Sequence, residues 1–264
     1  MKQIILFSAI MLTSIHLYAQ PGRGYVRDAI ERKYEDDNKG SKAKGEAWLS
    51  DMMNGKTESS YSFPISINMH VTSYKDGEKK DESDILYYLN GSQKYFGFKP
   101  VDEKKKKKKD EMFMIYDNKN NSMITLNDDE KTGMAININS FMSADAQARR
   151  GQGYDNGPIS DVKCNKTGKT KTILGYTCSE YVCIDEERNR KTEVWVTTKL
   201  NIDISQSFAR SPYSYLATGK NTGGFMMEAT HYKNNQIESK MEVTNVNESA
   251  NVTKNISDYK MGPR

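Results

Sequence analysis

Residues 61–71 read YSFPISINMHV, and every second position from Phe63 to Val71 is apolar. Successive side chains of a β-strand point to opposite faces of a sheet, so this alternation predicts a strand with one buried face. The pair Asp76-Gly77 follows, and both residue types tolerate the positive φ angles of a two-residue hairpin turn. The stretch therefore predicts a long strand and the first turn of an antiparallel sheet.

The same pattern continues along the chain to residue 246. Turn-forming groups separate the apolar runs at Asn90-Gly91, Lys131-Thr132-Gly133, Thr167-Gly168-Lys169 and Asn234-Asn235. About ten strands joined by hairpins predict a mainly β fold with a single antiparallel sheet and a few short helices, one of them over 144–150. Strand–helix alternation with a glycine-rich phosphate loop does not occur, which disfavours a doubly wound α/β fold. The expected strands cover 61–71, 85–89, 93–98, 112–116, 123–126, 134–138, 162–164, 173–184, 193–197, 225–232 and 237–246.

The first nineteen residues have the order of a secretory signal peptide. Lys2 is followed by an apolar run from Ile4 to Leu12 that only Ser8 interrupts, and a small residue, Ala19, precedes Gln20. That order is typical of an exported chain cleaved after Ala19. The run is shorter than the roughly 20 residues of a membrane span. The expected location is the periplasm or the extracellular space, with a soluble mature chain and no later transmembrane segment.

Composition divides the rest of the chain and excludes one class of partner. Residues 20–60 predict a helical or linker lead-in, 61–246 the β domain, and 247–264 a polar tail. A net charge of +4 with 28% charged residues is too weak a basic bias for a nucleic-acid surface. The lysine run 104–109 lies between acidic residues and predicts a solvated hairpin loop, with contact to an anionic membrane as the alternative.

Three cysteines, Cys164, Cys178 and Cys183, permit one disulfide in an oxidising compartment. Cys178 and Cys183 fall in one predicted strand, on opposite faces and roughly 16 Å apart at about 3.3 Å per residue. A bridge needs Cα atoms within about 7 Å. We therefore expect Cys164 to pair with Cys178. Metal ligation is less favoured because no Cys-x-x-Cys motif or histidine lies near them.

No sequence motif indicates catalysis or a cofactor. The chain has no Gly-x-Ser-x-Gly elbow, His-Glu-x-x-His helix or phosphate loop. His70 and His231 both fall in predicted strands, without a metal-ligand partner at helical or turn spacing. Methionine is abundant, with pairs at 52/53, 112/114 and 226/227. These pairs are compatible with ordinary core filling, with an adaptable lining for an apolar ligand, or with copper(I) binding.

Three further residues have the character of structural positions. Gly175 interrupts an apolar β-run, which predicts a bulge or a close backbone approach. Tyr181 and Trp195 are large and amphipathic, so we expect them to anchor the packing of the sheet. Trp195 is also a candidate for ligand contact.

The segments KTGKTKTILGYTCSEYV (166–182) and EVWVT (193–197) resemble a secreted family of domains of unknown function (DUF4412-like) common in Bacteroidetes-type bacteria. The upstream MIYD (114–117) and the downstream GFMME (224–228) fit the same pattern. The resemblance covers roughly 61–246; the lysine run, the lead-in, Cys164 and Cys183 depart from it.

Such families resemble the lipoprotein-carrier (LolA/LolB-like) architecture, a curved antiparallel half-barrel packed against helices. The resemblance implies a concave apolar surface and no catalytic residues. We expect an exported, non-enzymatic protein that binds an apolar or amphipathic ligand of lipid or lipoprotein type, with Met112, Met114, Trp195 and Met227 as candidate contacts. The alternatives are a cell-envelope interaction or structural protein with a filled core, and a metal-responsive envelope protein.

Overall fold

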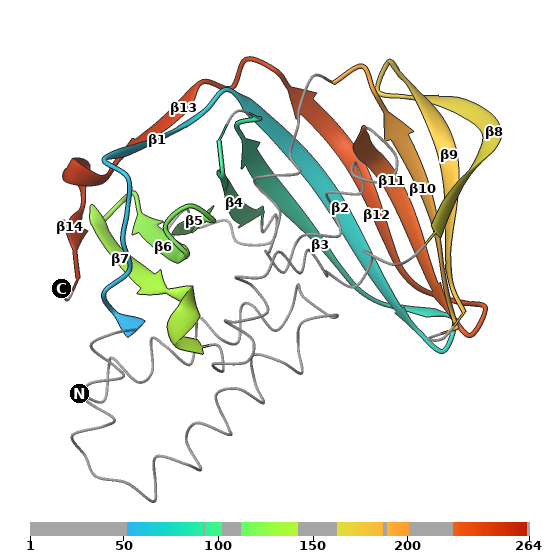
Figure 1. Cartoon of the computed structure of the whole chain (residues 1–264), viewed down its shortest axis with the longest axis horizontal. Helices are drawn as coiled ribbons and strands as arrows, with labels where there is room; N and C mark the ends of the chain where they lie inside the picture. The colour runs from blue at the N-terminus through green and yellow to red at the C-terminus, as the bar shows by residue number, and fades with distance from the viewer. Residues whose placement is uncertain are drawn as a thin grey trace, which may run out of the picture.

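The structure is a computed structural model that describes residues 52–91, 93–101, 112–141, 163–186, 189–200 and 224–262. In these residues twelve strands form one sheet in the order β14-β7-β6-β5-β4-β3-β2-β12-β11-β10-β9-β8, and β1 and β13 form a separate two-stranded ribbon. Figure 1 shows the large sheet as a strongly curved, open surface. All its pairings are antiparallel except that of β14 with β7. The predicted mainly β fold with a single curved antiparallel sheet is confirmed.

The strands of the large sheet pair mostly with their neighbours in the chain, with two long-range pairings, β2 with β12 and β7 with β14. The elements are β1 (Ser60–Phe63), β2 (Ile65–Lys75), β3 (Glu78–Leu89), β4 (Tyr95–Val101), β5 (Met112–Asp117), β6 (Ser122–Asn127), β7 (Thr132–Asn137), the 3₁₀ helix η1 (Ile138–Phe141), β8 (Lys163–Ile173), β9 (Tyr176–Asp185), β10 (Arg190–Thr197), β11 (Phe225–Lys233), β12 (Gln236–Asn247), β13 (Val252–Asn255), the 3₁₀ helix η3 (Ile256–Asp258) and β14 (Lys260–Met261).

The stretch 61–71 forms two strands in place of one. Proline has no backbone N–H to donate to a ladder, and Pro64 is the break between β1 and β2. Beyond the break, β2 pairs with β12 and β3, whereas β1 turns away to pair with β13. The predicted Asp76-Gly77 turn is confirmed, because both residues have positive φ (55° and 83°) between β2 and β3.

The turn prediction near residue 168 is wrong. Thr167-Gly168-Lys169 forms a bulge inside β8, where the register with β9 shifts between Lys166 and Thr170. The hairpin turn is instead Leu174-Gly175, with φ of 50° and 84°. Gly175 is therefore a turn residue and not the predicted bulge; a glycine takes this φ without the steric cost that a side chain adds.

The position of this turn also corrects the predicted disulfide. A hairpin turn fixes which residues of its two strands lie opposite each other, and the Leu174-Gly175 turn places Cys164 opposite Cys183 and Lys171 opposite Cys178. The structure accordingly bridges Cys164 to Cys183, with Cα atoms 4.0 Å apart, and leaves Cys178 as a buried free thiol. The expectation that Cys178 and Cys183 share a strand without pairing is confirmed.

The predicted polar tail, 247–264, belongs in large part to the fold. Residues 252–261 form β13, η3 and β14, and Ile256 and Tyr259 are buried beside Tyr61, Phe63 and aliphatic residues of β5 and β6. Alternation within so short a stretch is too brief to separate a strand from a loop. The pairing with β1 and β7 comes from distant parts of the chain, which local pattern does not reveal.

Several predictions fall outside the described residues. These are the signal peptide 1–19, nearly all of the lead-in 20–60, the lysine run 104–109 and the helix over 144–150. Within the described ranges, no helix is long and apolar enough to cross a membrane.

Candidate functional site

One face of the large sheet carries a continuous apolar surface, which the strand register defines. Directly opposed residues of neighbouring strands share a face. One such row runs Met114–Phe98–Tyr87–Ile67–Val246 across β5, β4, β3, β2 and β12. A second runs Val71–Met241–Ala229–Val194–Tyr181 across β2, β12, β11, β10 and β9. We call the surface that these two rows span the apolar face.

Aromatic rings form the centre of the apolar face. Tyr87 lies 6.5 Å from Phe96 and 6.3 Å from Phe98 between ring centroids, and Phe96 stacks on Tyr116 at 5.5 Å. All four side chains are buried and belong to one cluster with the aliphatic residues of β9 to β12. A single apolar surface therefore extends from the half of the sheet that contains β4 and β5 to the half that contains β9 to β12.

The opposite face differs between the two halves. Over β4 to β7 it is covered by the ribbon, which Figure 1 shows running past β5, β6 and β7. There Phe63, Phe113 and Ile115 form a second, separate core. In the other half, the same face is polar. The row through Glu180, Trp195, Glu228, Glu242 and His70 carries four ionisable side chains and one indole.

Salt bridges hold the lysines of this polar half. Lys171 lies 2.6 Å from Glu228 and 4.4 Å from the centre of the Trp195 ring. Lys191 lies 2.9 Å from Glu193, and Lys169 lies 3.1 Å from Glu180. Each of these lysines therefore has a carboxylate partner on its own face of the sheet.

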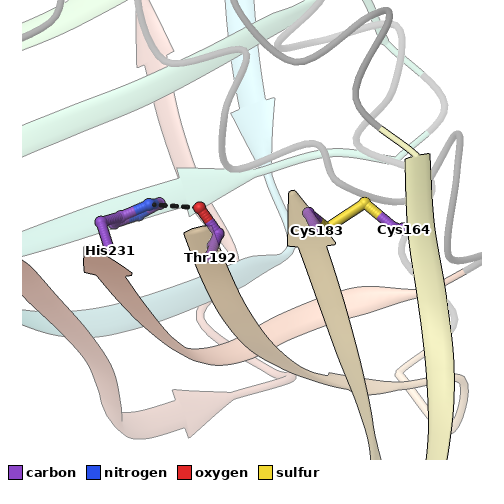
Figure 2. The surroundings of a disulfide bond; sticks show 4 residues. All are labelled: Cys164, Cys183, Thr192 and His231. Carbon is purple, nitrogen blue, oxygen red and sulfur yellow. Dashed lines mark hydrogen bonds between the residues drawn. A yellow bond between two sulfur atoms is a disulfide. The ribbon is translucent and has the colours of Figure 1, made fainter. Parts of the chain in front are cut away.

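A further row on the apolar face crosses β8, β9, β10 and β11 and includes polar groups. It lies toward the β9–β10 and β11–β12 turns. Figure 2 shows the Cys164–Cys183 bridge, Thr192 and His231 side by side on β8, β9, β10 and β11. His231 Nδ1 lies 3.0 Å from Thr192 Oγ1. Burial, followed by the nearby Arg190 charge, lowers the pKa of His231 to about 4. The imidazole is therefore neutral at physiological pH and acts as a hydrogen-bonding group.

A pocket of about 170 Å³ lies between β8, β9 and β10, at the end of the Val71–Tyr181 row. Tyr181 and Val196 belong both to its lining and to the apolar cluster. The remaining lining is polar: Lys166, Thr177, Ser179, Thr198 and Lys199. We call this cavity the lysine pocket.

The structure brings only some of the predicted contact residues together. Met112 and Met114 alternate with the second-core residue Phe113, and Met114 packs on the apolar cluster, as does the fully buried Met227. Trp195 lies on the polar face, opposite Glu180 and Glu228. It lies on the other side of the strand from Val194 and packs, partly buried, against the apolar cluster. Its predicted contact with a ligand stays a prediction.

Sequence reasoning missed the residues that give this region its chemistry. Strand pairing places Lys166 opposite Tyr181 and His231 opposite Thr192. Lys199, which follows β10, lines the pocket together with Lys166 and Tyr181. The available signal was the register set by the hairpin turn, and Thr167-Gly168-Lys169 obscured it by resembling a turn. Within the described ranges no group of three or more His, Cys, Asp or Glu side chains is placed to bind a metal ion.

Comparison with known proteins gives one family and several distant structures. The family model "Domain of unknown function (DUF4412)" matches residues 63–256. No curated protein sequence matches the chain.

Similar solved structures include PNGF-II, at 14% identity and a TM-score of 0.37 over 75% of this chain. The chain spans 30% of the length of PNGF-II. LprF from Mycobacterium bovis is similar at 12% identity and a TM-score of 0.32, with 81% of this chain and 97% of LprF covered. The LolA superfamily protein NE2245 from Nitrosomonas europaea is similar at 7% identity and a TM-score of 0.24, with 76% and 91% covered.

Proposed function

The chain belongs to the family described as a domain of unknown function, DUF4412, and we propose that its curved sheet is a non-catalytic binding surface for an apolar or amphipathic molecule of lipid type. The ligand's apolar part lies along the apolar face. The protein acts as an exported carrier or receptor in the cell envelope.

The observation that carries this proposal is the extent of the apolar face. It continues from β6 to β9, through Met123, Tyr87, Val243 and Val194. In the described part of the chain, the ribbon is the one additional sheet, and it packs on the other face, on the second core. A one-layer sheet must bury its apolar face against some other element or molecule.

The side chains of the apolar face suit a ligand of variable shape. Met69, Met114, Met123, Met226 and Met241 all belong to the cluster or pack on it. Methionine is unbranched and polarisable, so it adapts to irregular apolar surfaces. This composition supports binding of flexible acyl or alkyl chains in preference to one rigid ligand.

A filled core without a ligand is the competing interpretation. Phe96 and Met227 are fully buried at 0% exposure, as they would be in a closed interior. Such a protein would act through a protein partner and would bind no lipid. The two interpretations differ in one measurable property, which is saturable binding of an uncharged alkyl probe.

Titration with an uncharged, environment-sensitive fluorescent alkyl probe tests the proposal. Val71 is half-buried and packs on the apolar cluster, so Val71→Gln adds a polar amide to the face without opening a large cavity. We expect the probe's Kd to rise about tenfold, corresponding to roughly 1.4 kcal/mol of lost apolar contact.

Glu242→Gln provides the matched control. Glu242 is exposed on the neighbouring strand β12, in the polar-face row, so this variant should bind the probe as the wild type does. Absence of saturable binding by the wild type, together with no lipid in an organic extract of the purified protein, would establish the filled core.

We also propose that residues 1–19 direct export. The Cys164–Cys183 bridge supports an oxidising compartment, because thiols remain reduced in the cytosol. Amino-terminal sequencing of the protein recovered from its native cell should begin at Gln20. Recovery of uncleaved protein from the cytoplasm would reject export.

A further inference from the structure

We propose that the lysine pocket binds the anionic headgroup, a phosphate or carboxylate, of an amphiphile whose apolar chain lies on the apolar face. This inference rests on the proposed function and adds to it the charge of the ligand and the point where its headgroup is held.

The pocket has the size and donors of a headgroup site. Its volume of about 170 Å³ is below the roughly 300 Å³ at which pockets for whole small molecules begin. Its lining supplies two ammonium groups, from Lys166 and Lys199, and four hydroxyls, from Thr177, Ser179, Tyr181 and Thr198. Ammonium groups and hydroxyls can all donate hydrogen bonds to an anionic oxygen, and charge-assisted bonds of this kind are the stronger ones.

The two lysines of the pocket differ from their neighbours in charge compensation. On the polar face, Lys169, Lys171 and Lys191 each lie within 3.1 Å of a glutamate oxygen. Among the described residues that line the pocket, none is acidic. Within the described ranges, neither Lys166 nor Lys199 forms a salt bridge. The pocket therefore presents two positive charges to a ligand.

The bulge and the disulfide set the position of Lys166. Within the bulge, Thr167 Oγ1 donates to Glu180 Oε2 at 2.7 Å, and this hydrogen bond together with Lys169 lowers the pKa of Glu180. Lys166, on the other side of the strand, lies opposite Tyr181, and the next pair on that side is Cys164–Cys183. Covalent linkage of β8 to β9 one pair away restricts the movement of Lys166 relative to the pocket.

The pocket is continuous with the apolar face. Lys166 ends the row Val71–Met241–Ala229–Val194–Tyr181, so five less polar residues lead directly to its ammonium group. Val196, in the pocket lining, is 3% exposed and lies opposite Met226. A molecule with its headgroup between the lysines therefore has an apolar surface for its chain beside it.

Calorimetric titration with three probes below micelle-forming concentrations tests the inference. The probes are dodecyl phosphate, an uncharged dodecyl glucoside and inorganic phosphate. The variant is Lys166→Gln/Lys199→Gln. Its control is Lys75→Gln/Lys240→Gln, which removes the same charge from β2 and β12 outside the pocket.

We expect the wild type to bind dodecyl phosphate at least about tenfold more tightly than dodecyl glucoside. The pocket variant should lose that preference and its dependence on salt concentration, and its affinity for the glucoside should stay unchanged. The control variant should keep the preference. The tenfold preference in Kd is a conservative expectation for two charge-assisted contacts, because such contacts together supply more free energy than a tenfold change in Kd requires.

The remaining outcomes separate this inference from the proposed function. Equal affinity of the wild type for both dodecyl probes overturns the headgroup site and leaves the apolar binding face intact. Binding of inorganic phosphate without either dodecyl probe, lost in the pocket variant, establishes a free-anion site and rejects the lipid-type ligand. Failure of all three probes to bind rejects both.

Discussion

Tyr61 and Asp117 form a buried hydrogen bond that ties the ribbon to the sheet. Tyr61 Oη donates to Asp117 Oδ2 at 2.8 Å, and both residues are 0% exposed. Asp117 also accepts from the Asn120 backbone N–H and side-chain amide. Burial and the Asp117 charge raise the pKa of Tyr61, so the phenol remains a donor. A buried carboxylate that loses a donor is destabilised because no water replaces it.

Tyr61→Phe should therefore lower the free energy of unfolding by about 1–3 kcal/mol. Urea denaturation measures the change. Tyr176→Phe is the matched control, because its hydroxyl pairs with Glu248 at an exposed position, and it should cost less than about 0.5 kcal/mol. Equal effects of the two substitutions would contradict a special role for the buried pair.

His231 predicts a pH dependence of stability with a definite sign. Its pKa is lowered to about 4 in the folded protein, against about 6.5 in an unfolded chain. Between these values the unfolded state takes up a proton that the folded state does not, so stability falls as the pH falls from about 6.5 to 4 and is constant above.

The contribution across that window should be roughly 1–3 kcal/mol. Urea denaturation from pH 4 to pH 7.5 should show a steeper loss for the wild type than for His231→Gln, in which the group is absent. Carboxylates titrate in both proteins, so the difference between the two curves isolates His231. Superimposable curves, or an imidazole NMR titration near pH 6.5, would show that this histidine is not shielded.

Among the elements, turns with residues suited to positive φ were predictable and the others were not. Asp76-Gly77 and Asn234-Asn235 were identified correctly because these residue types tolerate the left-handed region. Leu174 has a φ of 50° although a leucine there is sterically unfavourable, so this turn was not recognised and Gly175 was interpreted as a bulge or a close backbone approach. The error moved the register of β8 against β9, and with it the cysteine partner and the position of Lys166.

Candidate site residues were harder to predict than strands. Alternation located the apolar positions of β2, and an apolar run located β5. Met114 packs on the apolar cluster, and its contact with a ligand stays a prediction. Which face each strand presents to its neighbours depends on register and on bulges such as the one between Trp195 and Val196. Trp195 was therefore assigned correctly to a strand, whereas its contact with a ligand stays a prediction.

Leu174 should be replaceable with a gain in stability. It is 48% exposed and occupies a left-handed backbone conformation. Leu174→Asn should raise the free energy of unfolding by about 0.5–1 kcal/mol because asparagine tolerates this φ. Leu174→Ala removes the same exposed surface but keeps the unfavourable φ, so it should give no gain. Thermal denaturation of both variants makes the comparison, and equal midpoints would contradict the backbone explanation.

The hairpin of β8 and β9 should depend on its disulfide. The Cys164–Cys183 bridge closes a loop with a sequence separation of 19, so Cys164→Ser/Cys183→Ser should cost about 3 kcal/mol in urea denaturation. Burial raises the pKa of the Cys178 thiol, so this cysteine should react with an alkylating reagent only after unfolding. A peptide map under non-reducing conditions that links Cys164 to Cys178 would contradict the structure and restore the pairing predicted from sequence.

At the scale of the whole molecule, the first and last described segments of the chain pair with each other and with the edge of the large sheet at β7. β1 pairs with β13, and β14 adds to β7 at the edge of the large sheet. Lys254 lies 2.6 Å from Asp128, which fixes the carboxy-terminal segment to the β6–β7 turn. The family match over 63–256 includes β13 and begins at Phe63, the last residue of β1, so one of the two ribbon strands lies inside the matched length.

This pairing predicts that the molecule unfolds as one cooperative unit. Twelve strands share one hydrogen-bonded ladder, and the ribbon covers only the half that lies far from β10. Ile256 is 6% exposed in the second core, and Ile256→Ala should cost about 2–4 kcal/mol. The effect should reach Trp195 on β10, which a background of Trp48→Phe leaves as the sole tryptophan.

Urea denaturation followed by Trp195 fluorescence should therefore show the same shift in midpoint as circular dichroism. Thr253→Ala, at an exposed position of β13, should shift neither signal. If Ile256→Ala leaves the Trp195 transition in place while circular dichroism shows an earlier one, the two halves of the sheet unfold independently. In that case a ligand bound on the apolar face, which spans both halves, would not raise one shared free energy of unfolding.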